Sequence, residues 1–408
     1  MKVMQINAVY GVGSTGIIVE DIHNLSLQSG IDSYVSYSTS PKSSSDIKNS
    51  YIIGDRLGKK IHAVLCRVGG KQAYFSRNAT RKLISYIEEV KPDVVHLHNL
   101  HSNYIHLNML LKYLASKNIH TVITLHDCWF YTGGCFHYTF DNCLKWLDSC
   151  GNCPKKRQDT PAYLYDSSAK ILADRKKYLS GISYLTVVGV SEWISKEAEK
   201  TFLRDKNIVT IHNGIDTDFF VDTPSSLRKK YGIEDKFVIL CPANKWLKQI
   251  NKETLEYVSS NLPSDSILVL LGCNAGQKIS LPDNVLPLDY VKDRDELRKV
   301  YSMADVFANC TREDSLSLIN VEVQSCGTPV VTYCNTGAKE TVDEKCGFSV
   351  ESGNYQDFLN RILYIKKQGK SAFSDNCHKW AVSKFCRDNN YRKYLELYYD
   401  LLQKGKKE

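Results

Sequence analysis

The chain has 408 residues, 43% of them hydrophobic, a length that exceeds one ordinary domain and suits two of about 200 residues each. No stretch approaches the ~18 consecutive apolar residues of a membrane-spanning helix, and the N-terminal MKVMQINAVY lacks the basic and apolar regions of a signal peptide. We therefore expect a cytoplasmic protein rather than an integral membrane protein.

The formal net charge of +8 lies entirely in the first half of the chain. Residues 1–212 carry 26 Lys and Arg against 18 Asp and Glu, whereas the remaining residues are balanced. This excess indicates either an ordinary solvated surface or a surface that faces something anionic, such as membrane lipid headgroups. No basic run is dense enough to indicate a nucleic-acid partner.

Strand-like apolar runs alternate with amphipathic helical patterns in both halves. We expect strands at residues 3–9, 33–37, 94–97, 120–125, 185–189, 237–241, 267–271, 306–308 and 329–333. Helical patterns fall between them, for example at residues 16–28, 81–90 and 252–260. This alternation predicts an α/β protein with parallel sheets covered on both faces, arranged as two doubly wound Rossmann-like domains.

The junction between the two domains is expected near the segment HNGID at residues 212–216, because Asn-Gly is a strong turn signal after an apolar run. The first domain is therefore residues 1–212. Ligands of open α/β sheets bind at the carboxyl ends of the strands, so we expect the active site in a cleft between two facing domains.

A glycine-rich loop, Gly11 to Gly16, follows the first predicted strand and opens a helix, as a dinucleotide-binding fingerprint does. That fingerprint also needs an acid at the end of the second strand, but SYVSYSTS ends in hydroxyls. NAD binding is therefore not expected. The loop can still approach a phosphate closely, which makes Gly13 and Gly16 candidate donor-binding residues.

Two acids, Asp314 and Glu322, lie eight positions apart after the apolar run at residues 306–308. If a helix begins near Ser315, its rise separates them by about 12 Å, roughly the length of a sugar diphosphate joined to a ribose. The helix N-terminus would then meet the diphosphate, and the two carboxylates would bind sugar and ribose hydroxyls. The alternative is a capping Asp with an unrelated surface Glu.

This segment resembles the donor-site motif of GT4-type retaining glycosyltransferases of the GT-B fold, in which two acids precede an Ala/Cys-x-Gly-x-Pro-Val-Val sequence. Asp314 stands where the family has Glu, with Glu313 beside it, and Glu322 matches the ribose-binding acid. By the same resemblance, Ser315 and Leu316 belong to the donor site.

The resemblance extends along nearly the whole chain. KPDVVHLHN and HNGIDTDFF are similar to family segments, and TLHDCWFYTGGC with GNCP resembles a bacterial surface-polysaccharide branch. KYLELYYDLL is similar to a terminal helix that crosses back to the first domain. This predicts a donor domain at residues 213–375 and a C-terminal helical segment at 376–408.

The family transfers a sugar from a nucleoside-diphosphate sugar to an acceptor hydroxyl with retention and needs no metal. The resemblance therefore implies a lipid-linked or oligosaccharide acceptor in cell-surface polysaccharide biosynthesis, at the inner face of the plasma membrane. It places His98 near the donor sugar, although a lone His after a strand is also a common core residue. His126 and Asp127 would face the acceptor, where an imidazole oriented by a carboxylate suits hydroxyl positioning or proton transfer.

One departure concerns the Arg and Lys that the family places after the first strand of the second domain. Here CPANKWLKQINKETL puts Gln249 and Ile250 at those positions. Lys245 or Lys248 would then hold the diphosphate, with Lys252 as a further candidate. Two alternatives stay open: a catalytically inactive binding subunit and a nucleotide-sugar epimerase of the same fold.

Four cysteines with the spacing C-x7-C-x6-C-x2-C form a separate candidate site. Their final C-x2-C is typical of zinc ligands, so we predict a loop of the first domain held by a structural zinc, with buried thiols or a redox-dependent disulfide as alternatives. The aromatic residues around them could stack on sugar rings or touch a membrane. The four are Cys135, Cys143, Cys150 and Cys153.

Overall fold

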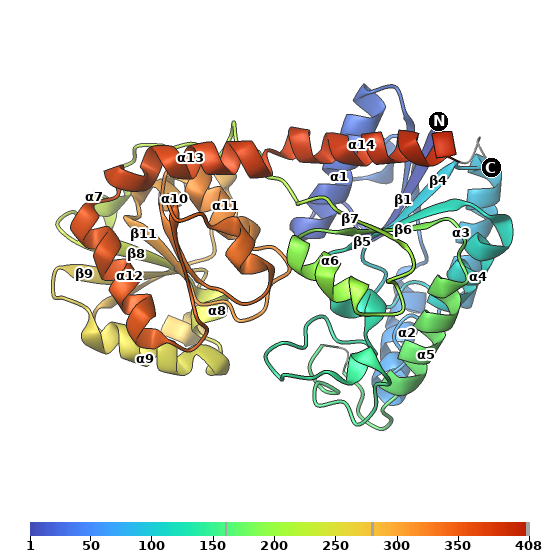
Figure 1. Ribbon diagram of the computed structural model, residues 1–408, viewed down its shortest axis with the longest axis horizontal. Coiled ribbons are helices and arrows are strands. Elements are labelled where there is room, and N and C mark those ends of the chain that lie inside the picture. The colour runs from blue at the N-terminus through green and yellow to red at the C-terminus, as the bar shows by residue number, and fades with distance from the viewer. Residues whose placement is uncertain (160, 279–280, 405–408) are drawn as a thin grey trace. The chain divides into compact units, whose positions relative to one another are not determined.

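The structure is a computed structural model that describes residues 1–159, 161–278 and 281–404. The chain divides into two compact units (Figure 1). The first unit contains residues 1–212 together with the C-terminal segment from Asn390, and the second unit contains Asn213–Asn389. None of the described helices is both long and apolar enough to cross a membrane.

The first unit is built on a seven-stranded sheet of order β3-β2-β1-β4-β5-β6-β7, in which every described pairing is parallel. Strands β4 to β6 are almost wholly buried, because helices cover both faces of a doubly wound sheet. The strands are β1 (Lys2–Val9), β2 (Asp32–Thr39), β3 (Ser50–Ile52), β4 (Val94–Leu97), β5 (His120–Leu125), β6 (Leu185–Gly189) and β7 (Asn207–Thr210).

All but the last of the first unit's helices lie between these strands in the chain, and the strand order reverses between β1 and β4. Side chains that follow those two strands therefore meet at one edge of the sheet, which is where doubly wound folds bind ligands. The helices are α1 (Gly13–Gln28), α2 (Arg56–Gly69), α3 (Arg77–Val90), α4 (Leu107–Lys117), α5 (Ser168–Ser180), α6 (Glu192–Glu199) and α14 (Arg387–Lys404).

The second unit repeats this plan with a six-stranded parallel sheet of order β10-β9-β8-β11-β12-β13. Its strand order reverses between β8 and β11. The strands are β8 (Phe237–Pro242), β9 (Ser266–Leu271), β10 (Val285–Leu288), β11 (Val306–Asn309), β12 (Val330–Tyr333) and β13 (Gly347–Val350). The helices are α7 (Leu227–Tyr231), α8 (Ala243–Trp246), α9 (Lys252–Asn261), α10 (Arg294–Met303), α11 (Leu318–Ser325), α12 (Tyr355–Gln368) and α13 (Ser371–Phe385). The predicted pair of Rossmann-like domains is thus confirmed.

The C-terminal segment differs from the prediction, because two helices stand where one segment from residue 376 is expected. Helix α13 packs on α11 and buries Cys377 and Ala381 within the second unit, so the boundary at 375 falls inside a helix. Helix α14 belongs to the first unit from Asn390 onward, and its Tyr394 and Tyr398 are fully buried. Residues 405–408 of the predicted segment lie outside the described residues.

Candidate functional site

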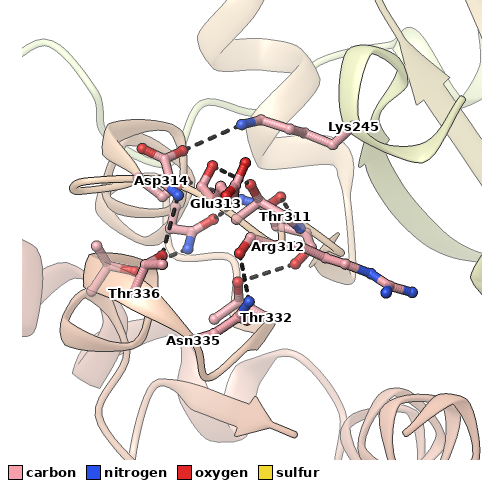
Figure 2. A network of polar contacts seen from close by, with 12 residues as sticks. Lys245, Thr311, Arg312, Glu313, Asp314, Thr332, Asn335 and Thr336 are labelled. Atoms are coloured by element: carbon pink, nitrogen blue, oxygen red, sulfur yellow. Dashed lines mark hydrogen bonds and ion pairs between the residues drawn. The ribbon is translucent and has the colours of Figure 1, made fainter. Parts of the chain in front are cut away.

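The carboxyl edge of the second sheet gathers charged side chains at the point where the strand order reverses. Helix α8 follows β8 and carries Lys245, and a loop at residues 310–317 follows β11. The Lys245 ammonium lies 3.5 Å from a carboxylate oxygen of Asp314 (Figure 2). Both side chains are about one quarter exposed, so this pair is open to a ligand.

The backbone of this loop is fixed by hydrogen bonds to the turn that follows β12. The Asp314 amide donates to the Thr336 hydroxyl at 3.1 Å, and the Asp314 carbonyl accepts from the Gly337 amide at 3.1 Å. The Asn335 side chain donates to the Arg312 carbonyl (Figure 2). These bonds fix the main chain and leave the charged side chains to act outside the loop.

Arg312 is a cation of this edge that the sequence analysis did not identify. Its Nε donates to the Asn251 side chain at 3.0 Å, and Figure 2 shows its guanidinium directed away from the loop backbone. An Arg placed three residues after a buried strand was the available signal. Lys248, by contrast, lies exposed on the turn after α8, next to the exposed Gln249.

The helix of the motif begins later than predicted, which corrects the position of Asp314. Helix α11 starts at Leu318 rather than near Ser315, so Asp314 lies in the preceding loop and caps nothing. The cause is a loop that is fixed by backbone bonds to the distant residues 336 and 337. Ser315 and Leu316 are buried there, and the Ser315 hydroxyl has no hydrogen-bond partner among the described residues.

Glu322 lies on α11, as predicted, and accepts a hydrogen bond from the Tyr301 hydroxyl at 3.0 Å. Burial raises the pKa of the Glu322 carboxyl to about 7, although the Tyr301 bond favours the charged form. At neutral pH this carboxyl is therefore about half protonated, and a ligand hydroxyl that donates to it would favour the carboxylate.

A cluster of histidines lies at the corresponding edge of the first sheet. His98, just after β4, is fully buried, and its two ring nitrogens lie 3.1 Å from His126 Nε2 and 3.1 Å from Gln5 Oε1. Burial and the neighbouring imidazoles lower the pKa of His98 well below its usual value, and burial lowers the pKa of His126 to about 4. Both rings are therefore neutral at pH 7.

The orientation of the Gln5 side chain determines which nitrogen of each ring carries the proton. Its Nε2 donates to the Val19 carbonyl at 3.3 Å, which turns its oxygen toward His98 Nε2. His98 Nε2 must then donate, so its Nδ1 accepts from His126 Nε2. This leaves the lone pair on His126 Nδ1, an atom with no partner among the described residues.

The predicted pairing of His126 with Asp127 is not found. The Asp127 carboxylate instead lies 3.3 Å from the His101 ring and accepts from the Trp129 amide at 2.8 Å. Burial alone would raise the pKa of Asp127, but these two bonds hold it below its usual value. Asp127 thus orients His101 and the start of the following turn, and the His98 side chain orients His126.

The glycine-rich loop divides into two roles. Gly16 is buried, and a Cβ atom there would come within 3.1 Å of the Val9 side chain, so this glycine is explained by helix–strand packing. Gly13 is exposed at the start of α1 with a φ of 65°, and an added Cβ atom would meet nothing within 4 Å. Gly13 therefore stays a candidate for ligand contact.

The predicted zinc site is not assembled. All four cysteines are free thiols in the described residues, and no group of three or more His, Cys, Asp or Glu side chains there is arranged to hold a metal ion. Burial raises the pKa of Cys135 to about 12 and of Cys150 to about 11, so these thiols stay protonated. The residues present do not fit a metal.

The loop that carries these cysteines is held by an arginine and by its own aromatic side chains. The buried Arg175 guanidinium stacks on the Trp129 ring at 3.8 Å and donates to the Trp129 and Thr132 carbonyls. Most aromatic residues predicted to meet sugar or membrane are buried instead, which leaves them a packing role; these are Trp129, Phe130, Tyr131, Tyr138 and Trp146.

Comparisons with known proteins agree with this architecture. Residues 30–219 match the model of Glycosyltransferase Family 4, and residues 256–381 match that of Glycosyl transferases group 1. The chain is 21% identical over 374 residues to the putative colanic acid biosynthesis glycosyl transferase WcaC of Escherichia coli K12, covering 86% of this chain and 87% of that protein. Two solved structures share the fold: a sucrose-phosphate synthase from Thermosynechococcus elongatus, with a TM-score of 0.69, 16% identity and 98% and 99% coverage, and Anabaena HepE in complex with UDP, with a TM-score of 0.66, 15% identity and 98% and 100% coverage.

Proposed function

This chain belongs to the GT4-type glycosyltransferases of the GT-B fold, and we propose that it transfers a sugar with retention from a nucleoside-diphosphate sugar to a hydroxyl of a lipid-linked glycan. The product would be part of a bacterial cell-surface polysaccharide, as the name of the WcaC relative suggests. The observation that carries the proposal is the group of Lys245, Arg312 and Glu322 at the carboxyl edge of the second sheet.

Glu322 would bind the ribose of the donor. Its half-buried carboxylate can accept from two vicinal hydroxyls, and the Tyr301 hydroxyl holds it in one orientation. A carboxyl group with a pKa of about 7 becomes fully charged when it binds these donors, which couples nucleotide binding at pH 7 to the release of about half a proton on average.

Lys245 and Arg312 would bind the diphosphate in place of the family's Arg-Lys pair. They come from two different strand ends, β8 and β11, that lie side by side in the sheet. As the bond between the sugar C1 and the diphosphate oxygen breaks, negative charge grows on the leaving group, and two fixed cations stabilise it. The buried Ser315 hydroxyl, which has no partner in the described chain, can donate to a phosphate oxygen.

His126 would contact the acceptor hydroxyl. Its unpartnered Nδ1 carries a lone pair and can accept the hydroxyl hydrogen while the acceptor oxygen forms its bond to C1. Since the pKa of His126 is about 4, it positions the hydroxyl and does not keep the proton. The proton finally leaves with the nucleoside diphosphate.

A thermal-shift screen of the purified chain against UDP-, GDP-, ADP- and dTDP-sugars tests the donor assignment. A ligand at 100 times its dissociation constant adds about 2.7 kcal/mol of stability, which such a screen detects. One responding nucleotide would identify the nucleotide of the donor. No response from a folded chain would contradict the proposal, and turnover of the donor without any acceptor would indicate an epimerase instead.

A further inference from the structure

We propose that one face of helix α2, together with residues 163–165, docks on an anionic lipid bilayer. We call this surface the α2 patch. It consists of Leu57, Ile61, Val64, Leu65 and Val68 of α2 with Tyr163, Leu164 and Tyr165 of the loop before α5. The inference does not rest on the donor site, because the patch lies wholly within the first unit and includes no residue assigned to the reaction.

The apolar residues of α2 point away from the protein. They recur at positions i, i+4, i+7, i+8 and i+11, which places them on one stripe of the helix, and they are between 41% and 68% exposed. The opposite stripe, with His62 and Cys66, is the buried one. A helix that packs its polar and small residues inward and exposes its large apolar ones has its main apolar face free for a partner.

The loop before α5 extends this apolar surface. The Tyr163 amide donates to the Arg67 carbonyl at 2.7 Å, and the Tyr165 amide donates to the Val68 carbonyl at 3.3 Å. These bonds hold Tyr163, Leu164 and Tyr165, each more than half exposed, beside the end of α2. Eight of the nineteen large apolar side chains that are exposed in the described residues therefore lie on this one patch.

The charge around the patch is predominantly positive. Residues 56–87 contain no Asp or Glu, and Arg56, Lys60 and Arg67 are exposed along one edge of the apolar stripe. The nearest acids, Asp55 and Asp166, each accept hydrogen bonds from backbone amides. The basic residues of this segment are Arg56, Lys59, Lys60, Arg67, Lys71, Arg77, Arg81 and Lys82.

This charge pattern selects the partner. A second copy of the chain would bring two strongly basic surfaces together, which is unfavourable, whereas an anionic bilayer attracts each Lys or Arg near its surface by about 1 kcal/mol. An apolar stripe with a basic edge is also the composition of helices that lie in the plane of a membrane interface. The first half of the chain carries the whole excess of positive charge, which agrees with this location.

A cavity beside the patch has the same mixed character. It has a volume of about 580 Å³, lies between α2 and α3, and shares Ile61 and Leu65 with the patch. Three cations, Lys59, Arg77 and Lys82, and one acid, Asp55, also line it. A lipid headgroup with its phosphate would find cations there while its acyl chains stay on the apolar side.

The test is flotation of the full chain with phosphatidylcholine vesicles and with vesicles in which about one third of the lipid is phosphatidylglycerol, at low and high salt. We expect binding to the anionic vesicles only, weakened by salt. The double variant Lys60→Gln/Arg67→Gln should bind about 25-fold more weakly, about fivefold for each lost charge. Its matched control, Lys229→Gln/Lys230→Gln on α7, should bind as the unchanged chain does.

The apolar contribution is tested by Leu57→Ser/Ile61→Ser, with Val382→Ser on α13 as the control for an exposed apolar residue. The first variant should lose binding and the control should keep it. Absence of binding by the folded, unchanged chain, or equal binding by patch variants and controls, would overturn the proposal. So would a dimer in sedimentation velocity that only the Leu57→Ser/Ile61→Ser change dissociates, because the patch would then be a face between two copies. All variants should keep the donor thermal shift, so a failure of the donor assignment stays distinguishable.

Discussion

The carboxyl edges of the two sheets carry opposite kinds of chemistry on the same plan. In the first unit the edge consists of the neutral, buried rings of His98 and His126, which are hydrogen-bonded to each other and to Gln5. Of the nitrogens of these two rings, His126 Nδ1 has no hydrogen-bond partner among the described residues. In the second unit the edge consists of partly exposed charges, with Lys245 and Arg312 beside Asp314. This difference is the basis for our proposal that the first edge positions a neutral acceptor hydroxyl and the second binds the diphosphate of the donor.

The largest expected effect comes from removing the cations at the carboxyl edge of the second sheet. Arg312→Ala and Lys245→Ala should each lower the turnover number about 10²-fold to 10³-fold, because each removes one fixed charge from the leaving diphosphate. The measurement is nucleoside-diphosphate release with the donor found in the screen and a lipid extract as acceptor. Lys252→Ala is the control, since Lys252 pairs with Glu256 at 3.3 Å on the surface of α9. Equal turnover in all three variants would remove both cations from the mechanism.

The next largest effect is expected from removing an imidazole at the carboxyl edge of the first sheet. His126→Ala should lower transfer about 10²-fold while leaving the donor dissociation constant unchanged, because in the proposed mechanism His126 contacts the acceptor and not the donor. Calorimetric donor titration and turnover, measured on the same preparation, separate the two quantities. A weaker donor affinity in this variant would contradict the division of roles between the two edges.

A third prediction concerns the pH dependence of donor affinity, which should arise from the second edge. Because the Glu322 pKa is raised to about 7, its proton competes with the ribose, so donor affinity should fall by up to about tenfold from pH 8 to pH 6. The unliganded protein should show the opposite trend in stability, since the native state keeps a proton that the unfolded chain loses as pH rises from about 4.5 to about 7.

The pH dependence is measured by titration with a nucleotide sugar, whose diphosphate has no ionisation in this range. Glu322→Gln should bind with no such dependence, and Glu322→Ala should lose about 1.5–3 kcal/mol of binding free energy. A pH dependence that persists in Glu322→Gln would assign the titrating group elsewhere.

The smallest expected effect concerns the hydrogen bonds of His96, beside the imidazoles of the first edge. Tyr398 of α14 lies 2.6 Å from His96 Nδ1, and His96 Nε2 lies 2.7 Å from the Thr124 hydroxyl. Tyr398→Phe should lower the free energy of unfolding by about 1 kcal/mol without changing donor affinity. Tyr399→Phe, at a half-exposed neighbouring position, should leave both unchanged in denaturant unfolding and titration.

The sequence predicted the fold because its apolar runs and helical patterns alternate without interruption. It also singled out Asp314 and Glu322 by their spacing, and these residues lie in the loop after β11 and on α11, at the edge where we propose that the donor binds. It could not show that α11 begins at Leu318, since the loop before the helix is fixed by residues 336 and 337, which are distant in the sequence.

Three further features depend on packing that no local pattern contains. The partner of Asp127 is His101 rather than the adjacent His126. Arg312 acquires its place only beside Asn251, which follows a different strand. Helix α2 has a regular apolar period, yet its apolar side faces outward, which period alone cannot indicate.

The most direct test of the central claim compares calorimetric titrations of the responding nucleoside-diphosphate sugar and of its bare nucleoside. The unchanged chain should bind the nucleotide sugar much more tightly than the nucleoside, and Lys245→Ala/Arg312→Ala should bind the two nearly alike. That result would show that these two cations replace the family's Arg-Lys pair as the diphosphate site. If the double variant keeps the full preference for the nucleotide sugar, the diphosphate is bound elsewhere and the account of the second edge is wrong.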